Sequence, residues 1–144
     1  MIKNSTKLQF ILLSIGLLMF NTSFAQPVCP SQKFTVFVKV FADDVGIQKA
    51  FTKVPLKTIN FYETDFKKPY VVHYLNRDMI DYPVFLSNAY REVEGIQQTI
   101  KRKNKQYIQV VTKHIGGTGS DNVTYDFRKR RGCWYLVAKL DYST

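Results

Sequence analysis

Apolar residues early in the chain recur at intervals of three and four, a spacing typical of helices. One helical face is formed by Phe34, Phe37, Val38 and Phe41. This spacing predicts a helix of about three turns, for which Ser31 is a candidate N-cap. The segment ADDVG, residues 42–46, interrupts the pattern, and IQKAFTK, residues 47–53, predicts a second, shorter helix. That helix should end before Pro55, because the residue preceding a proline is disfavoured in the helical conformation.

Beyond Pro55, β-branched and aromatic residues are concentrated in short runs that predict strands. The first two runs are residues 58–62 and 69–75. Residues 76–94 predict mostly loop with a short strand at 84–86, and GIQQTI is a weaker strand candidate. The clearest strands come last, at residues 106–115, 122–127 and 133–142. Loops of about four to six residues join these three strands, as expected for two hairpins in series.

Helices first and a meander of strands last predict an α+β fold. The final strand has one strongly apolar face, which we expect to point into the core and which consists of Trp134, Leu136, Ala138 and Leu140. Side chains alternate between the two faces of a strand, so Cys133 should point away from that core.

The first 25 residues have the composition of an export signal. Two lysines precede an apolar run at residues 10–20, and small residues follow it up to Ala25. The apolar run is shorter than the about 20 residues that span a bilayer. We therefore expect cleavage after Ala25 and a periplasmic or secreted protein without a membrane span. Residues 26–144 have the length of a single domain.

The chain is basic, with 21 lysines and arginines against 11 acidic residues and a formal net charge of +10. The presumed leader contains two lysines and no acid, so its removal leaves a charge of +8. Such a charge favours anionic partners, for example envelope polysaccharide, lipid headgroups or acidic proteins. Nucleic acid is not expected as a partner of an exported protein, and self-association stays open.

Eight of the cations fall in two short runs, KRKNK and RKRR. They are Lys101, Arg102, Lys103, Lys105, Arg128, Lys129, Arg130 and Arg131. In a meander, the start of one strand and the second following turn lie at the same end of the sheet, so the two runs should be neighbours. Two interpretations stay open: a solvated end that discourages edge-to-edge pairing, or an anion-binding patch.

Two cysteines, Cys29 and Cys133, follow the presumed leader, where oxidation is expected. A bridge between them would close a loop of about 100 residues and stabilise the fold by roughly 4–5 kcal/mol. The alternative is two unpaired thiols that pack as small apolar residues. The outward direction expected for Cys133 argues against the bridge, unless the amino-terminal segment wraps around the sheet edge. The cysteines and histidines have no metal-ligand spacing, and no cofactor is predicted.

Few other residues suggest chemistry. Asp43 and Asp44 are adjacent and do not face each other on a helix, so capping of the second helix is favoured over a paired-carboxylate site. His73 lies in a strand, either as an ordinary half-exposed histidine or as a general base. Asp44 and His73 are the candidate polar groups of a pocket. The glycine-rich residues 116–120 lack the lysine and helix of a phosphate-binding loop.

Two segments carry a family resemblance. Residues 34–56 combine aromatic residues with an acid, an Ile–Gln pair and a Pro–Leu pair, at Phe34, Phe37, Phe41, Asp44, Ile47, Gln48, Pro55 and Leu56. Residues 125–138 contribute Tyr125, Phe127, Gly132, Trp134, Leu136 and Ala138. Both segments resemble the family called domain of unknown function 4348. Phe51 and Cys133 depart from its pattern, which has a basic and a small residue at these positions.

The resemblance implies an exported protein of Gram-negative bacteria. It also implies helices packed on a strongly bent antiparallel sheet, a roll of the nuclear transport factor 2-like or cystatin-like kind. No catalytic residue is implied. Together with the charge, this predicts a non-enzymatic binding domain for an anionic or small-molecule ligand of the cell envelope. The alternatives are an isomerase-like or dehydratase-like enzyme acting in a cone-shaped pocket, and a protein-interaction or inhibitor module.

Overall fold

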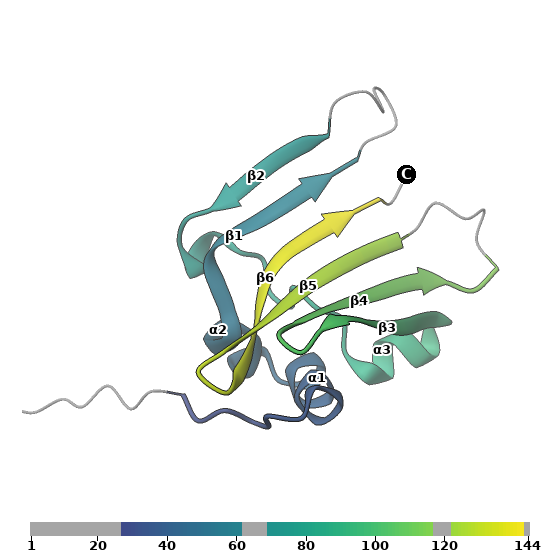
Figure 1. The fold of residues 1–144 in the computed structure, drawn as a ribbon. Coiled ribbons are helices and arrows are strands. Elements are labelled where there is room, and N and C mark those ends of the chain that lie inside the picture. The colour runs from purple at the N-terminus through teal and green to yellow at the C-terminus, as the bar shows by residue number, and fades with distance from the viewer. Residues whose placement is uncertain (1–26, 62–68, 117–121, 143–144) are drawn as a thin grey trace, which may run out of the picture.

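The computed structural model describes residues 27–61, 69–116 and 122–142 (Figure 1). Its elements are α1 (Phe34–Asp43), α2 (Val45–Phe51), β1 (Thr52–Asn60), β2 (Tyr70–Tyr74), the 3₁₀ helix η1 (Arg77–Met79), α3 (Asn88–Val93), β3 (Ile96–Asn104), β4 (Tyr107–His114), β5 (Asn122–Arg130) and β6 (Cys133–Asp141). The expected export signal lies outside the described residues, as does most of the glycine-rich loop. Within those residues, no helix is both long and apolar enough to cross a membrane.

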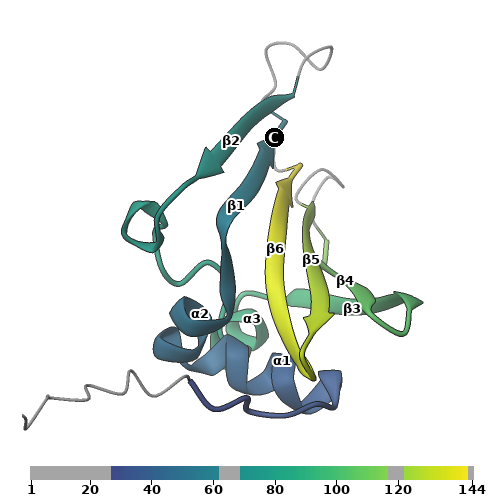
Figure 2. The same cartoon turned by 60° about the vertical axis from the view of Figure 1, so that its left-hand side comes forward.

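The six strands form one sheet in the order β2-β1-β6-β5-β4-β3. The helices gather at one end of this sheet, and β3 and β4 turn steeply away from the direction of β1 and β6 (Figure 2). Register shifts in β1 and between Asp126 and Phe127 of β5 mark irregularities that accompany this bend. The expected α+β fold, with helices packed on a strongly bent sheet, is confirmed.

The sheet departs from the expected antiparallel pattern at one pair. β1 and β6 run parallel, with Thr52 beside Leu136 and Lys57 beside Ala138. Both strands start at the helical end of the sheet, since β1 follows α2 directly and β6 follows the β5–β6 turn (Figure 1). This non-local pairing places the start of β1 next to the last hairpin.

Helix α1 buries the face that the sequence predicts. Its buried residues are Phe34, Phe37, Val38, Phe41 and Ala42. The prediction of Ser31 as N-cap was wrong, because Lys33 occupies that position and provides no side-chain cap. Ser31 instead accepts a hydrogen bond from the Lys33 amide at 3.0 Å, which turns the chain just before the helix.

The two adjacent aspartates form hydrogen bonds to two different helices. The capping interpretation is confirmed for Asp44. Asp44 accepts a hydrogen bond from the Ile47 amide at 3.0 Å and is the N-cap of α2. Asp43 accepts hydrogen bonds from the backbone and side chain of Asn88, at the start of α3. These bonds stabilise the carboxylate and hold the pKa of Asp43 below its ordinary value.

The core is a cluster of aromatic rings around Phe127 of β5, which is fully buried. Edge-to-face contacts at centroid distances of 5.3–6.2 Å join its ring to Phe34, Phe37, Phe41 and Phe85. Trp134 of β6 packs edge-on against Phe34, and its indole N–H donates to the Gln32 carbonyl at 3.0 Å. The expected burial of Trp134, Leu136 and Ala138 is confirmed, whereas Leu140 is only half-buried.

The expected strand at residues 84–86 was wrong. The Phe85 side chain is fully buried, as that of a core strand residue would be. Its backbone, however, forms hydrogen bonds with a side chain rather than with another strand. Its N–H donates to Gln48 Oε1 at 3.1 Å, and its carbonyl accepts from Gln48 Nε2 at 2.8 Å. The buried amide of Gln48 thus satisfies both backbone groups and ties this segment to α2.

Replacing Phe37 with alanine should lower the free energy of unfolding by about 3–5 kcal/mol, because the ring is fully buried among four aromatic neighbours. Val36, on the exposed side of α1 with 45% of its surface accessible, provides the matched control. Val36→Ala should cost less than about 1 kcal/mol. Urea denaturation of both variants measures the difference, and equal costs would show that α1 does not pack as described.

Candidate anion-binding cleft

The two basic runs are neighbours, as the meander predicts. Tyr107 at the start of β4 pairs with Arg128 of β5, and the Lys129 amide donates to the Gln106 carbonyl at 2.8 Å. The first run is not an entry loop, because β3 continues through it to Asn104. Lys101, Arg102 and Lys103 are therefore exposed on an edge strand of the sheet, where charge discourages pairing with another chain.

The cations of the second run divide into two pairs. The Arg128 guanidinium lies 4.0 Å from the centroid of the Tyr107 ring, and Lys129 Nζ lies 5.6 Å from that of the Trp134 ring. Both side chains are thereby engaged with aromatic rings of the sheet. The following two, Arg130 and Arg131, reach a different environment.

Arg130 and Arg131 line a cleft with a volume of about 390 Å³. The other lining residues are Lys53, Val54, Arg77 and Tyr135. Four of the six lining residues are cations, and none of these six is acidic. The side chains come from the start of β1, from η1, and from the β5–β6 hairpin. The cleft is therefore a concentrated positive site, without a carboxylate among its described lining residues.

A second cleft, of about 340 Å³, adjoins the first. Its lining residues are Pro27, Cys29, Ala50, Phe51, Arg77, Arg131, Cys133 and Tyr135. Arg77, Arg131 and Tyr135 line both clefts, so the two are adjacent compartments. The first compartment is cationic, and the second is walled mainly by apolar and sulfur-bearing side chains.

The backbone of the β5–β6 turn places Arg131 at the apex of the hairpin. Arg131 and Gly132 form a two-residue loop with φ values of 47° and 82°, the signature of a type I′ turn. Glycine adopts this left-handed conformation freely, whereas a side chain in it costs about 1 kcal/mol or more. Asparagine is the usual residue at the first turn position. Arginine is therefore a locally unfavourable choice here, which points to a use for its side chain.

Arg77 is anchored to the helix layer. Its Nε donates to the Lys49 carbonyl, in the last turn of α2, at 2.8 Å. This bond fixes the base of the guanidinium near the start of β1, where Lys53 lies. Neither Arg77 nor Lys53 belongs to a basic run, so local sequence gives no signal for them. The parallel pairing of β1 with β6 brings Lys53 to the β5–β6 hairpin, and the bond to the Lys49 carbonyl places Arg77 beside it.

Cys29 and Cys133 form a disulfide with a Cα–Cα distance of 5.8 Å, which settles the alternative left open by the sequence. Cys133 does alternate with the core residues Trp134 and Leu136, as expected. It is nevertheless buried, because the amino-terminal segment runs along this end of the sheet (Figure 2). The bond from Trp134 to Gln32 fixes the same segment. The disulfide thus holds part of the wall of the second compartment.

The two polar residues expected in a pocket lie elsewhere. Asp44 caps α2, and His73 lies in β2, an edge strand of the sheet, opposite Lys57. Both side chains are exposed, and neither lines the two compartments. They therefore do not form a buried acid–base pair.

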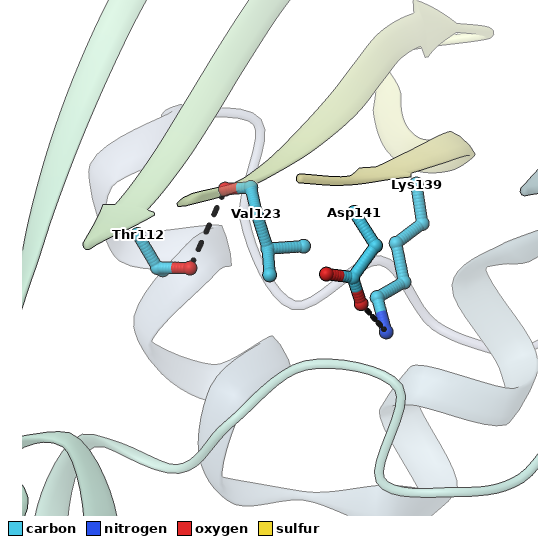
Figure 3. A network of polar contacts seen from close by, with 4 residues as sticks. All are labelled: Thr112, Val123, Lys139 and Asp141. Carbon is cyan, nitrogen blue, oxygen red and sulfur yellow. Dashed lines mark hydrogen bonds and ion pairs between the residues drawn. The ribbon is translucent and has the colours of Figure 1, made fainter. Parts of the chain in front are cut away.

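Away from the basic cleft, a set of polar contacts lies on β4, β5 and β6 (Figure 3). Its cation is paired with a carboxylate. Lys139 Nζ lies 3.2 Å from an Asp141 carboxylate oxygen, and Thr112 Oγ1 donates to the Val123 carbonyl at 3.4 Å. Nearby Tyr125 is buried, and its desolvation, together with the charge of Asp141, raises its pKa far above the ordinary value. Tyr125 therefore stays neutral. The basic cleft differs in having cations without acidic partners on its wall.

Comparison with known proteins supports the fold. No family model and no curated protein matches the chain. The structure is similar to that of an NTF2-like protein from Bacteroides fragilis, with a TM-score of 0.57 and 18% sequence identity. The match covers 82% of this chain and 50% of that one, so this chain spans about half the length of its structural relative. The likeness shows an NTF2-like fold.

Removing the disulfide should destabilise the protein. The Cys29→Ser/Cys133→Ser variant should lose about 2–5 kcal/mol of unfolding free energy, because the bridge closes a very long loop of the unfolded chain. Denaturation of the variant, and of the wild type with and without reductant, measures the loss. The reduced wild type should match the variant. Identical unfolding midpoints for the oxidised wild type and the variant would contradict this assignment.

Proposed function

We propose that this protein is a non-enzymatic binding domain that holds an anionic ligand in the basic cleft. The supporting observation is that Lys53, Arg77, Arg130 and Arg131 line one cleft, and that none of the described residues on its wall is acidic. A bound anion would offset the mutual repulsion of these cations. Guanidinium groups also form paired hydrogen bonds to carboxylate, phosphate and sulfate oxygens.

The eight cations first singled out by the sequence then have separate roles. Arg130 and Arg131 contact the ligand together with Lys53 and Arg77. The cations of β3 protect the sheet edge and attract anions from a distance, an effect that salt screens over about 8–10 Å. The proposal thus keeps the anion-binding interpretation for the β5–β6 turn and assigns the solvated-edge interpretation to the edge strand β3.

Binding accounts for the described residues better than catalysis does. The aromatic cluster around Phe127 fills the space between α1 and the helical end of the sheet. Asp44 and His73 are exposed on separate elements, whereas general acid–base chemistry needs titratable groups with tuned pKa values at the reacting atoms. A small-molecule isomerase or dehydratase is therefore the weaker proposal.

We further propose that the protein is exported, with residues 1–25 as its leader, and acts in the periplasm or outside the cell. The disulfide supports an oxidising compartment. The segments that resemble domain of unknown function 4348 support membership of that family, whose exported character agrees with this location.

Phosphate binding by residues 26–144 should depend on salt and on the turn arginines. We expect the Arg130→Ser/Arg131→Ser variant to lose roughly tenfold or more in affinity, since it removes two charge-assisted contacts. The wild-type affinity should also fall between low and moderate salt. Isothermal titration calorimetry with inorganic phosphate measures both effects.

The matched control is Lys101→Ser/Lys103→Ser, which removes the same charge from the exposed strand β3. Its affinity should stay within about threefold of the wild type, because only long-range attraction is lost. Equal losses in the two variants would show that phosphate responds to net charge and not to the cleft.

Arg131→Asn separates the folding role of the turn from its binding role. Asparagine suits the left-handed conformation of the first position in a type I′ turn, so the variant should unfold at a slightly higher temperature. It should bind phosphate more weakly, because one guanidinium is lost from the cleft. Calorimetric unfolding and titration measure the two properties. A stabilised variant with unchanged affinity would remove Arg131 from the proposed site.

A further inference from the structure

We infer that the cleft takes an organic phosphate monoester, with the phosphate in the cationic compartment and a ring or other apolar body in the compartment beside the disulfide. The inference rests on the proposed function and specifies its ligand. It follows from the different chemistry of two compartments that share Arg77, Arg131 and Tyr135.

The cationic compartment is suited to a ligand group with more than one negative charge. Four cations converge on it, three of them arginines, from three separate elements. A phosphate monoester carries about 1.5–2 negative charges near neutral pH and presents three terminal oxygens to donors from several directions. A single carboxylate offers two oxygens in one plane and leaves most of the positive charge unbalanced. Phosphate therefore matches this compartment better than a simple carboxylate does.

The second compartment is suited to an uncharged part of the ligand. Away from the shared arginines, its walls are Pro27, Ala50, Phe51 and the Cys29–Cys133 disulfide. Phe51 and Cys133 are almost fully buried, so the apolar surface open to a ligand comes mainly from Pro27, Cys29 and Ala50, and the two shared arginines supply the polar part of the wall. A ring placed here would contact apolar carbon and sulfur, and burial of such surface favours binding.

Tyr135 lies where the two compartments meet. Its ring centroid is 5.5 Å from that of Phe51, with a tilt of 45° between the planes. Phe51 is almost fully buried and fixes one side of the tyrosine ring, whereas Tyr135 itself is half-exposed. The partly open aromatic surface is suited to stack against the ring that carries the phosphate.

The disulfide gives the apolar compartment a definite wall. Cys29 belongs to the amino-terminal segment and Cys133 to the first position of β6. Without the bridge, the segment around Pro27 is no longer tied to the sheet at this point. The preference for an apolar body should therefore depend on the bridge, whereas the cationic compartment is built from β1, η1 and the β5–β6 turn and should persist.

The test compares inorganic phosphate with phenyl phosphate by titration calorimetry on residues 26–144. Phenyl phosphate should bind roughly tenfold or more tightly, because its ring removes apolar surface from water. Ala50→Leu, which fills the second compartment on a half-exposed helical position, should abolish this advantage and leave the affinity for inorganic phosphate within about twofold. Circular dichroism verifies that the variant is folded, and Cys29→Ser/Cys133→Ser should show the same selective loss.

Two further arms distinguish the source of the phosphate. Tight binding of phenyl phosphate without sedimentation on phosphatidic acid vesicles indicates a soluble phosphate monoester, and sedimentation with the vesicles without tight binding of phenyl phosphate indicates a lipid phosphate. Equal affinities of the wild type for inorganic and phenyl phosphate would overturn the inference but leave the anion-binding function intact. If neither ligand binds, the proposed function fails as well.

Discussion

The packing of α1 and its aromatic residues against Phe127 is the interaction on which the rest of the structure depends. Phe34, Phe37 and Phe41 all contact this one ring, so the first helix is fixed on the last hairpin. α2 and β1 follow without a long loop, and β1 is delivered next to β6 in a parallel pair. The cleft is a consequence, since Lys53 and Arg77 reach the turn arginines only through this placement.

The distribution of charge separates structural polar groups from those available to a ligand. Asp43, Asp44 and the Lys139–Asp141 pair each have partners within the fold, at helix ends or along one strand. The four cations of the cleft share a wall on which the described part of the chain places no acid. Repulsion of this kind lowers stability, as does an arginine in a left-handed turn. Two unfavourable features at one place are more readily explained by binding than by folding.

Sequence reasoning succeeded where the determining interactions are local. The helical face of α1, the capping by Asp44 and the two hairpins that bring Lys129 next to Gln106 all follow from spacing of about four residues or from short turns. It failed where a distant partner decides the outcome. Residues 84–86 look like a strand, but the amide of Gln48 takes the place of a neighbouring strand. The sequence could not decide whether the disulfide forms, because its formation depends on the path of the amino-terminal segment. Half of the cations in the cleft were missed, because Lys53 and Arg77 stand outside the basic runs.

Nuclear magnetic resonance of residues 26–144 can locate anion binding residue by residue, by following arginine side-chain Nε–H signals and backbone amides during addition of inorganic phosphate. The account predicts that the signals of Arg77, Arg130 and Arg131 shift together and saturate with one affinity, along with the amide of Tyr135. Shifts confined to the exposed cations of β3, or small shifts spread over all basic residues without saturation, would contradict it.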